Sequence, residues 1–255
     1  EVISFSANFD TQGTHVGEVR VNGDNFDDDN SFFFTVDVLP KIRVLLVNGE
    51  ASENWFDDEG HWFGLAVSSA AQSPFELSSI EPAELSAAVL RRNDVAVLLN
   101  VGDLSTAQAE AVEEYVNNGG SLLLAPGDRV NPNIFNRQFA EIAPATIGSQ
   151  GQLGIDDYLV IADFDRRHPI LRPLDSDWLA RFQGHWSLSA HAESDVLMQF
   201  DNTEPALLER KVGNGKVILF ASSLDLEWNN LALQGLFLPF VHETLRHLVQ
   251  SEKKQ

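Results

Sequence analysis

The pattern of hydrophobic and polar positions changes near residue 40. Before that point, apolar and polar residues alternate in the segments 2–5, 16–21 and 32–38. Alternation with a period of two is typical of strands that bury one face. Three such strands are too few for a closed sandwich. We therefore expect residues 1–40 to form a partial all-β segment.

From residue 41 onward, continuous apolar runs alternate with helical patterns. The runs 42–47, 94–101 and 121–125 are rich in Val, Leu and Ile, as is typical of strands buried on both faces. A shorter candidate strand covers residues 75–80. Strands that recur about every 25–30 residues with a helix between them form the βαβ pattern, which predicts a parallel sheet.

Local signals place several further elements. Ser105 and Gln108 form a capping-box pair that should open a helix ending at residues 118–120, which read Asn-Gly-Gly. The second half of the chain is less regular. There the pattern predicts strands at 158–162 and 196–200, a hairpin over 205–221 and a final amphipathic helix over 233–249.

Composition excludes several functional classes. Asp and Glu total 38 against 17 Lys and Arg, which gives a formal net charge of −21 and argues against nucleic-acid binding, because a phosphate backbone would be repelled. No apolar run reaches about 18 residues, so none of these helices is expected to span a membrane. Cysteine is absent, which excludes disulfides, Cys–zinc sites and a Cys nucleophile.

A set of short stretches, weak one by one, resembles a known family when taken in order and spacing. These stretches are residues 44–50, 94–101, 115–123, 127–128, 168–169, 205–210, 213–220, 228–230 and 237–243. Residues 41–249 resemble class I glutamine amidotransferase-like domains. The resemblance is greatest to the version found in bacterial membrane proteins of the BatA (aerotolerance-associated) type.

The resemblance implies both a fold and a location. The fold would be a flavodoxin-like three-layer α/β/α domain over residues 41–255, with a mostly parallel central sheet, preceded by an immunoglobulin-like remnant in residues 1–40. In such proteins the domain lies between membrane helices on the outer side of the cytoplasmic membrane. The resemblance therefore implies a periplasmic fragment of a membrane-anchored envelope protein, with protein partners and with flanking segments that reach the membrane. The start at Glu1, inside an alternating pattern, also suggests a fragment.

The catalytic residues of that family are missing here. A working amidotransferase of this class needs a Cys on a tight strand-to-helix turn and a His beyond the last main strand. The corresponding turn reads Pro126-Gly127-Asp128-Arg129, and no His follows the strand at 217–223. We therefore expect a non-catalytic binding or scaffold module that needs no cofactor, with Asp128 at the degenerate catalytic turn.

Candidate ligand-binding residues follow the predicted parallel strands. Open α/β sheets bind ligands outside the carboxyl ends of their strands. Glu50 and Glu53 follow the first buried strand, while Asp128 and Asn131 follow the strand at 121–125. One alternative is a hydrolase of another class, with Asp128 as nucleophile in an acidic crevice. A simple cap or turn explains Asp128 without any chemistry.

Two further features leave functions open. Asp24, Asp27 and Asp29 lie at a spacing that could bind Ca²⁺ and support a Ca²⁺-dependent interaction, although a solvated turn explains them more simply. The seven His residues show no metal-binding spacing, so structural roles are the default interpretation. Trp55 and Phe56 fall near the first crevice and would mark a protein or glycan contact if they are exposed.

Overall fold

The computed structural model describes residues 7, 9, 11–20, 30–69, 73–154 and 156–250. The chain divides into two units, Glu1–Lys41 and Ile42–Gln255, which are described separately. In the first unit, β1 (Gly13–Arg20) pairs with the antiparallel β2 (Ser31–Val38).

Several predictions for the first unit fall outside the described residues. They are the strand at 2–5 and the Ca²⁺ loop with Asp24, Asp27 and Asp29. The pairing of β1 with β2 shows that two of the three predicted strands form. An immunoglobulin-like origin of this unit stays a prediction.

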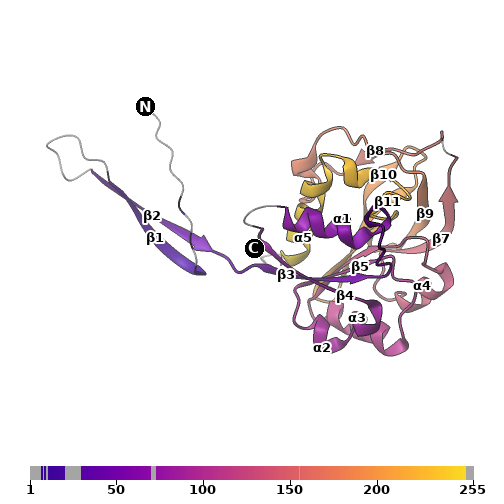
Figure 1. Cartoon of the computed structure of the whole chain (residues 1–255), viewed down its shortest axis with the longest axis horizontal. Helices are drawn as coiled ribbons and strands as arrows, with labels where there is room; N and C mark the ends of the chain where they lie inside the picture. The colour runs from indigo at the N-terminus through magenta and orange to yellow at the C-terminus, as the bar shows by residue number, and fades with distance from the viewer. Residues whose placement is uncertain are drawn as a thin grey trace. The chain divides into compact units, whose positions relative to one another are not determined.

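A mixed sheet forms the centre of the second unit (Figure 1). Its strands follow the order β4-β3-β5-β6-β12-β11-β10-β8. The first five strands in that order are parallel, and the last three alternate in direction. The bounds are β3 (Ile42–Asn48), β4 (Phe75–Ile80), β5 (Val95–Leu99), β6 (Ser121–Ala125), β8 (Ile161–Phe164), β10 (Ser194–Phe200), β11 (Pro205–Val212) and β12 (Gly215–Phe220).

Helices cover both faces of this sheet. In Figure 1, α1 (Glu59–Ser68) and α5 (Phe237–Val249) lie on one face, and α2 (Ala87–Leu90) and α3 (Thr106–Asn117) lie on the other. The parallel strands are therefore buried on both sides, which explains their unbroken apolar sequences. All five residues of β5 and all five of β6 are buried.

Capping residues determine where two of these helices begin. The side chain of Ser105 accepts a hydrogen bond from the backbone of Gln108, whose side chain accepts from the backbone of Ser105, as the sequence predicted. Asp58 caps α1 by accepting from the backbone of His61. The predicted final helix begins later than expected, because residues 231–233 form a separate 3-10 turn.

The sequence patterns did not predict several other elements. The helix α4 (Pro132–Gln138) follows β6, and β7 (Ala145–Gln152) pairs with β9 (Gly184–Ala190) in a separate antiparallel sheet. The sequence of β7 is mostly small and polar and gives little alternation to detect. Three more 3-10 turns cover Trp55–Asp57, Pro82–Glu84 and Arg172–Leu174. None of the helices in the described part of the chain is both long and apolar enough to cross a bilayer.

Candidate functional site

The candidate site lies where three neighbouring parallel strands end. Strand β3 has β4 on one side and β5 on the other, so the chain reverses its direction of winding at this point. Open α/β sheets form their ligand crevices at such a switch, outside the carboxyl ends of the strands. Glu50 follows β3, Asn100 follows β5 and Asp128 follows β6.

Asn100 connects the two carboxylates that the sequence singled out. Its Nδ2 donates to Glu50 Oε2 at 2.8 Å and to Asp128 Oδ1 at 2.9 Å. Its Oδ1 accepts the backbone N–H of Arg129 at 3.0 Å. The Asn100 side chain is buried, while Glu50 is half-buried and Asp128 is exposed. Glu50 and Asp128 thus accept from the same amide, and their role in ligand binding stays a prediction.

Backbone conformation allows the segments that follow β3, β5 and β6 to approach one another closely. Asn100 has a φ of 49°, in the left-handed region that Asn tolerates better than most residues. A Cβ on Gly49 would lie 2.0 Å from the carbonyl oxygen of Asn100, and one on Gly127 would lie 2.5 Å from the Asn100 side chain. Both positions therefore require glycine for the ends of the strands to meet.

Like charges crowd the carboxyl ends of these strands, where Glu50, Asp128, Asp225 and Glu227 form the group that we call the acidic crevice. Burial raises the pKa of Glu50, and repulsion from Asp128 raises it further, while Arg129 opposes the shift. Burial also raises the pKa of Asp225, with repulsion from Asp128 contributing. The pKa of Glu227 is raised by burial first and by Asp225 next. Holding these carboxylates close together is therefore electrostatically unfavourable, and a nearby positive charge would reduce their repulsion.

Glu59 is the most buried acid beside this crevice. It occupies the first turn of α1, and its side chain is almost fully buried. Its Oε2 accepts from the backbone N–H of Leu224 at 3.2 Å, while its Oε1 has no hydrogen-bond partner among the described residues. Burial, followed by repulsion from Asp225, raises the pKa of Glu59 well above its usual value.

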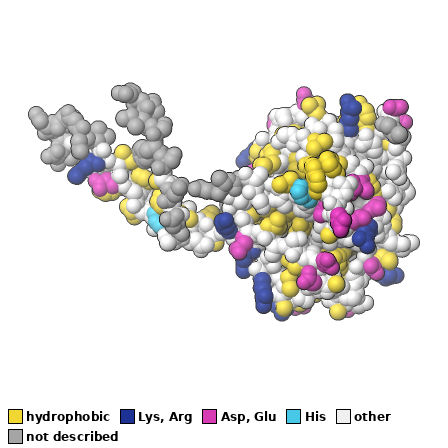
Figure 2. Space-filling view, viewed as in Figure 1, with side chains coloured by type: hydrophobic (Ala, Val, Ile, Leu, Met, Phe, Trp, Pro, Cys, Tyr) yellow, Lys and Arg dark blue, Asp and Glu magenta, His cyan; other side chains and the backbone are white. Residues whose placement is uncertain are grey.

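Exposed aromatic rings lie on the loop that follows Glu50. The rings of Trp55 and Phe56 stack with centroids 3.7 Å apart, and each residue is 45% exposed. His61 lies 5.4 Å from the Trp55 ring. Figure 2 shows Asp and Glu side chains gathered around the region of α1, with hydrophobic side chains beside them. Exposed rings next to carboxylates favour contact with a partner that is both cationic and partly apolar.

Two of the four predicted ligand-binding residues do not join the crevice contacts. Asn131 caps α4 by accepting from the backbone of Asn133 and Ile134. Glu53 is exposed, and within the described part of the chain it makes no hydrogen bond or ion pair. Asp128 does not cap α4, because Asn131 does; it lies in the turn after β6 and accepts from Asn100.

No described His serves as a base for these carboxylates. Among the described residues, no His side chain bonds to Glu50, Asp128 or Asp225. After β12, Ser223 donates to Asp225 Oδ1 at 2.6 Å, and Ser222 donates to the carbonyl of Gly184. Both hydroxyls are buried, whereas Glu50 and Asp128 remain available as acceptors for a bound group.

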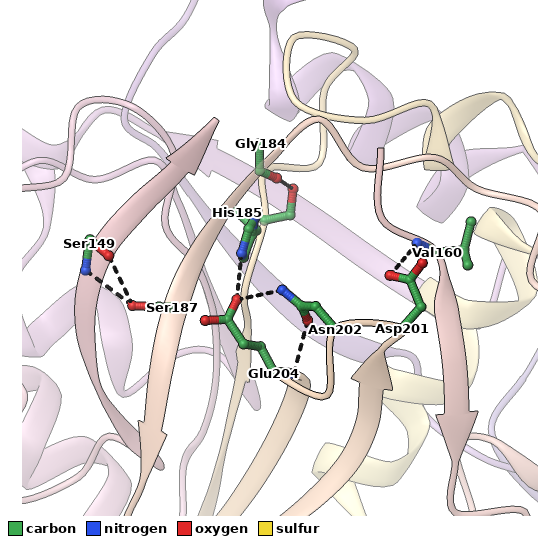
Figure 3. Close-up of polar contacts among 9 residues, drawn as sticks. Ser149, Val160, Gly184, His185, Ser187, Asp201, Asn202 and Glu204 are labelled. Atoms are coloured by element: carbon green, nitrogen blue, oxygen red, sulfur yellow. Dashed lines mark hydrogen bonds and ion pairs between the residues drawn. The ribbon is translucent and has the colours of Figure 1, made fainter. Parts of the chain in front are cut away.

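A second polar cluster lies around β9 (Figure 3). His185 Nε2 and Glu204 Oε2 are 2.7 Å apart, and Asn202 Nδ2 donates to the same oxygen at 3.0 Å. Ser149 and Ser187 contact each other separately, and neither hydroxyl bonds to His185. Figure 3 shows the His185 and Glu204 side chains pointing toward each other, so this pair ties the turn before β11 to β9.

The sequence analysis missed a third cluster. His168, Glu209 and His247 are 41 and 38 positions apart along the chain, yet their side chains meet. Two imidazoles beside one buried carboxylate lower the pKa of Glu209 to about 2, although burial alone would raise it. No local motif contains these residues, so only the fold brings them together.

Comparisons with known proteins identify only the fold. No family model matches the chain, and no curated protein matches it. The cytoplasmic protein STM3548 from Salmonella typhimurium aligns at 16% identity over 93% of this chain and 96% of its own, with a TM-score of 0.65. A putative ThuA-like protein from Bacteroides uniformis aligns at 13% identity over 84% and 94%, with a TM-score of 0.64.

A large enzyme contains a similar fold as one part. The β-galactosidase from Bacillus circulans sp. alkalophilus aligns at 14% identity over 82% of this chain and 30% of its own, with a TM-score of 0.58. At such identities the likeness concerns the fold alone. The shared fold is a mixed α/β fold around one large sheet.

The comparisons overturn two predictions. The resemblance to BatA-type amidotransferase-like domains is wrong, because the similar structures are named as cytoplasmic and ThuA-like proteins. The predicted location on the outer side of the membrane depended on that resemblance and is wrong with it. The short weak motifs misled because βαβ units share such strand and turn sequences whatever their family.

Proposed function

We propose that this chain is a non-catalytic binding module whose acidic crevice receives a Lys or Arg side chain from a basic segment of a protein partner. The contact that carries the proposal is the pair of hydrogen bonds from Asn100 Nδ2 to Glu50 and Asp128. They hold two carboxylates together where open α/β sheets bind ligands. A cation between these carboxylates replaces their repulsion with attraction.

The aromatic pair supports a protein partner rather than a free inorganic cation. Trp55 and Phe56 are exposed and stacked, and the backbone N–H of Leu226 donates to the carbonyl of Phe56 at 3.4 Å. This contact connects the aromatic loop to the segment that carries Asp225 and Glu227. Aromatic rings beside charged residues are typical of the few residues that dominate protein interfaces.

The hydrolase alternative has no observation in its favour. It requires Asp128, Glu50 and a His within hydrogen-bond reach, with one of them free to attack. Asp128 accepts from Asn100 instead, and no His side chain among the described residues bonds to Asp128 or Glu50. Robust turnover of small esters or amides that Asp128→Asn abolishes would restore this alternative.

A finer description of the fold belongs with the proposal. The five parallel strands have the order 2-1-3-4-5 when numbered along the chain, with helices on both faces. This order supports a flavodoxin-like three-layer arrangement, whose ligands bind at the switch between the first and third of these strands. Glu50 and Asn100 follow those two strands.

The proposal is tested by titrating a short Lys- and Arg-containing peptide while following tryptophan fluorescence. We expect saturable binding that weakens with added salt, because the pairing is electrostatic. The double variant Glu50→Gln/Asp128→Asn should bind at least about 10-fold more weakly, the equivalent of one to two charge-assisted contacts. The control is Glu110→Gln/Glu141→Gln, which removes the same charge from two exposed positions.

Three results have distinct meanings. Loss of binding in the crevice variant alone supports the proposal. Equal weakening in both variants means that the overall negative charge attracts the peptide, and the crevice is then not the site. Binding that is unchanged in the crevice variant overturns the proposal.

A further inference from the structure

We propose that His168, Glu209 and His247 form a binding site for one Zn²⁺ ion, separate from the acidic crevice. The three side chains come from distant parts of the fold. His168 lies in the loop after β8, Glu209 lies on β11, and His247 lies in the last turn of α5.

The candidate ligand atoms converge on one point. His247 Nε2 lies 2.5 Å from Glu209 Oε2, and His168 Nε2 lies 3.4 Å from the same oxygen. One candidate atom from each residue lies within 4.8 Å of the other two. The two imidazole rings are 4.6 Å apart between centroids and meet edge to face. A small movement of these side chains would place a metal ion within bonding distance of all three.

The surrounding structure holds the site in place. Strand β11 lies between β10 and β12, so Glu209 is held by pairing on both sides. Its side chain is 6% exposed, that of His247 is 9% exposed, and that of His168 is 13% exposed. Ligands held this firmly are largely preorganised, and the slight exposure of His168 leaves one side through which an ion could enter.

The donor set matches zinc. Two imidazole nitrogens and one carboxylate oxygen are the ligands of many zinc sites that keep a fourth position for water. The carboxyl end of a helix also favours positive charge, because its carbonyl groups point outward. His247 lies at that end of α5.

Contacts within the cluster must change when the ion binds. The backbone N–H of Ile170 donates to His168 Nδ1 at 3.4 Å, which puts the single proton of a neutral His168 on Nε2. Zinc bound at Nε2 requires that proton to move to Nδ1. The ring then loses this long hydrogen bond, and the contacts of both imidazoles with Glu209 Oε2 are replaced by metal–ligand bonds.

This site is independent of the proposed peptide site. Ser121, the first residue of β6, donates through its hydroxyl to the carbonyl of Leu248, the residue after His247. The end of α5 that carries His247 therefore lies near the start of β6. Glu209 pairs with Ile218, which pairs with Leu123 in the middle of β6, while Glu50 and Asp128 follow the carboxyl ends of β3 and β6. Substitutions in the crevice leave all three zinc ligands unchanged.

The proposal is tested with chelator-treated protein titrated with zinc chloride in a calorimeter, and by the zinc content after dialysis. We expect one ion per chain, with affinity reduced at least about 10-fold by His168→Gln and by His247→Gln, since each removes a ligand. His61→Gln is the control, because it removes an exposed imidazole outside the cluster. Glu50→Gln/Asp128→Asn should bind zinc as the unsubstituted chain does.

Thermal unfolding distinguishes the loss of a zinc ligand from a folding defect in the variant. Zinc should raise the Tm of the unsubstituted chain but not that of His168→Gln, which alters the most exposed ligand. Absence of saturable binding to the unsubstituted chain overturns the proposal. Binding that survives both His substitutions, or that is lost in the crevice variant instead, also overturns it.

Discussion

The side-chain nitrogen of Asn100 donates to Glu50 Oε2 and to Asp128 Oδ1, at 2.8 and 2.9 Å. One buried amide thereby holds two carboxylates that are 78 positions apart in sequence (128 − 50). Because carboxylates repel each other, this donor stabilises both the end of the sheet and the geometry of the crevice.

Two substitutions of Asn100 test how much its side-chain donor contributes to stability. Asn100→Asp should lower the free energy of unfolding by about 2–4 kcal/mol near neutral pH, because a third carboxylate replaces the shared donor. Asn100→Gly keeps the left-handed backbone available and removes only the amide, so a loss of about 1–2 kcal/mol is expected. Urea unfolding measures both. An Asp variant at least as stable as the Gly variant would contradict the electrostatic account.

Glu59 should make stability depend on pH. Its pKa is raised in the folded state, so the folded chain holds a proton that the unfolded chain releases. Stability is then fully present below the ordinary pKa of Glu and falls by about 1.4 kcal/mol per pH unit as pH rises from there toward the folded pKa.

Glu59→Gln cannot ionise and should remove this dependence. The Tm difference between the variant and the unsubstituted chain should therefore shift in favour of the variant between about pH 5 and pH 7. Glu110→Gln, at an exposed position, provides the matched control. Parallel pH profiles for all three proteins would show that Glu59 ionises normally.

Glycine at position 49 is expected to be essential for the closed end of the sheet. A methyl group there would meet the carbonyl of Asn100 at 2.0 Å and Val101 Cα at 2.7 Å. Gly49→Ala should therefore cost about 3 kcal/mol or more of stability. The control is Gly64→Ala in α1, where the nearest atom is 3.8 Å away and added helix propensity should stabilise by up to about 1 kcal/mol. Chemical unfolding of both variants distinguishes a steric effect from a general intolerance of alanine.

Trp55 and Phe56 should matter for binding more than for folding. Both are 45% exposed, so Trp55→Ala and Phe56→Ala should change the stability by no more than about 1 kcal/mol. Each should weaken binding of the basic peptide several-fold, because a cation over an aromatic face gains about 0.5–1 kcal/mol at an exposed site. Leu179→Ala, at an apolar position that is 70% exposed, should leave peptide affinity unchanged. Affinity that is independent of Trp55 and Phe56 would remove the aromatic pair from the proposed interface.

The sequence was informative wherever local periodicity decides the structure. Strands β4 and β6 have the predicted bounds, and the capping box at Ser105 forms as expected. Glu50 and Asp128 both follow parallel strands, where ligands bind in open α/β sheets, and they share the donor Asn100. These features follow from short-range patterns and from βαβ topology.

The remaining features depend on tertiary structure. Asn100 was predicted as part of a strand, and nothing local marks its left-handed backbone or its role as a shared donor. Asn131 follows β6, as the sequence predicted, but it caps α4, a helix that the sequence pattern did not indicate. His168, Glu209 and His247 meet only because α5 packs beside β11 and the loop after β8, and no sequence spacing encodes that packing.

The central claim is that the crevice around Asn100 binds a basic side chain. The most direct measurement is the NMR signal of the Asn100 side-chain amide, assigned by comparison with Asn100→Gly, during titration with the basic peptide. We predict that this signal shifts and saturates together with the tryptophan fluorescence, and that Glu50→Gln/Asp128→Asn abolishes the shift. If the peptide binds and shifts other NMR signals while the signal of the Asn100 amide does not shift, the peptide does not bind at Asn100.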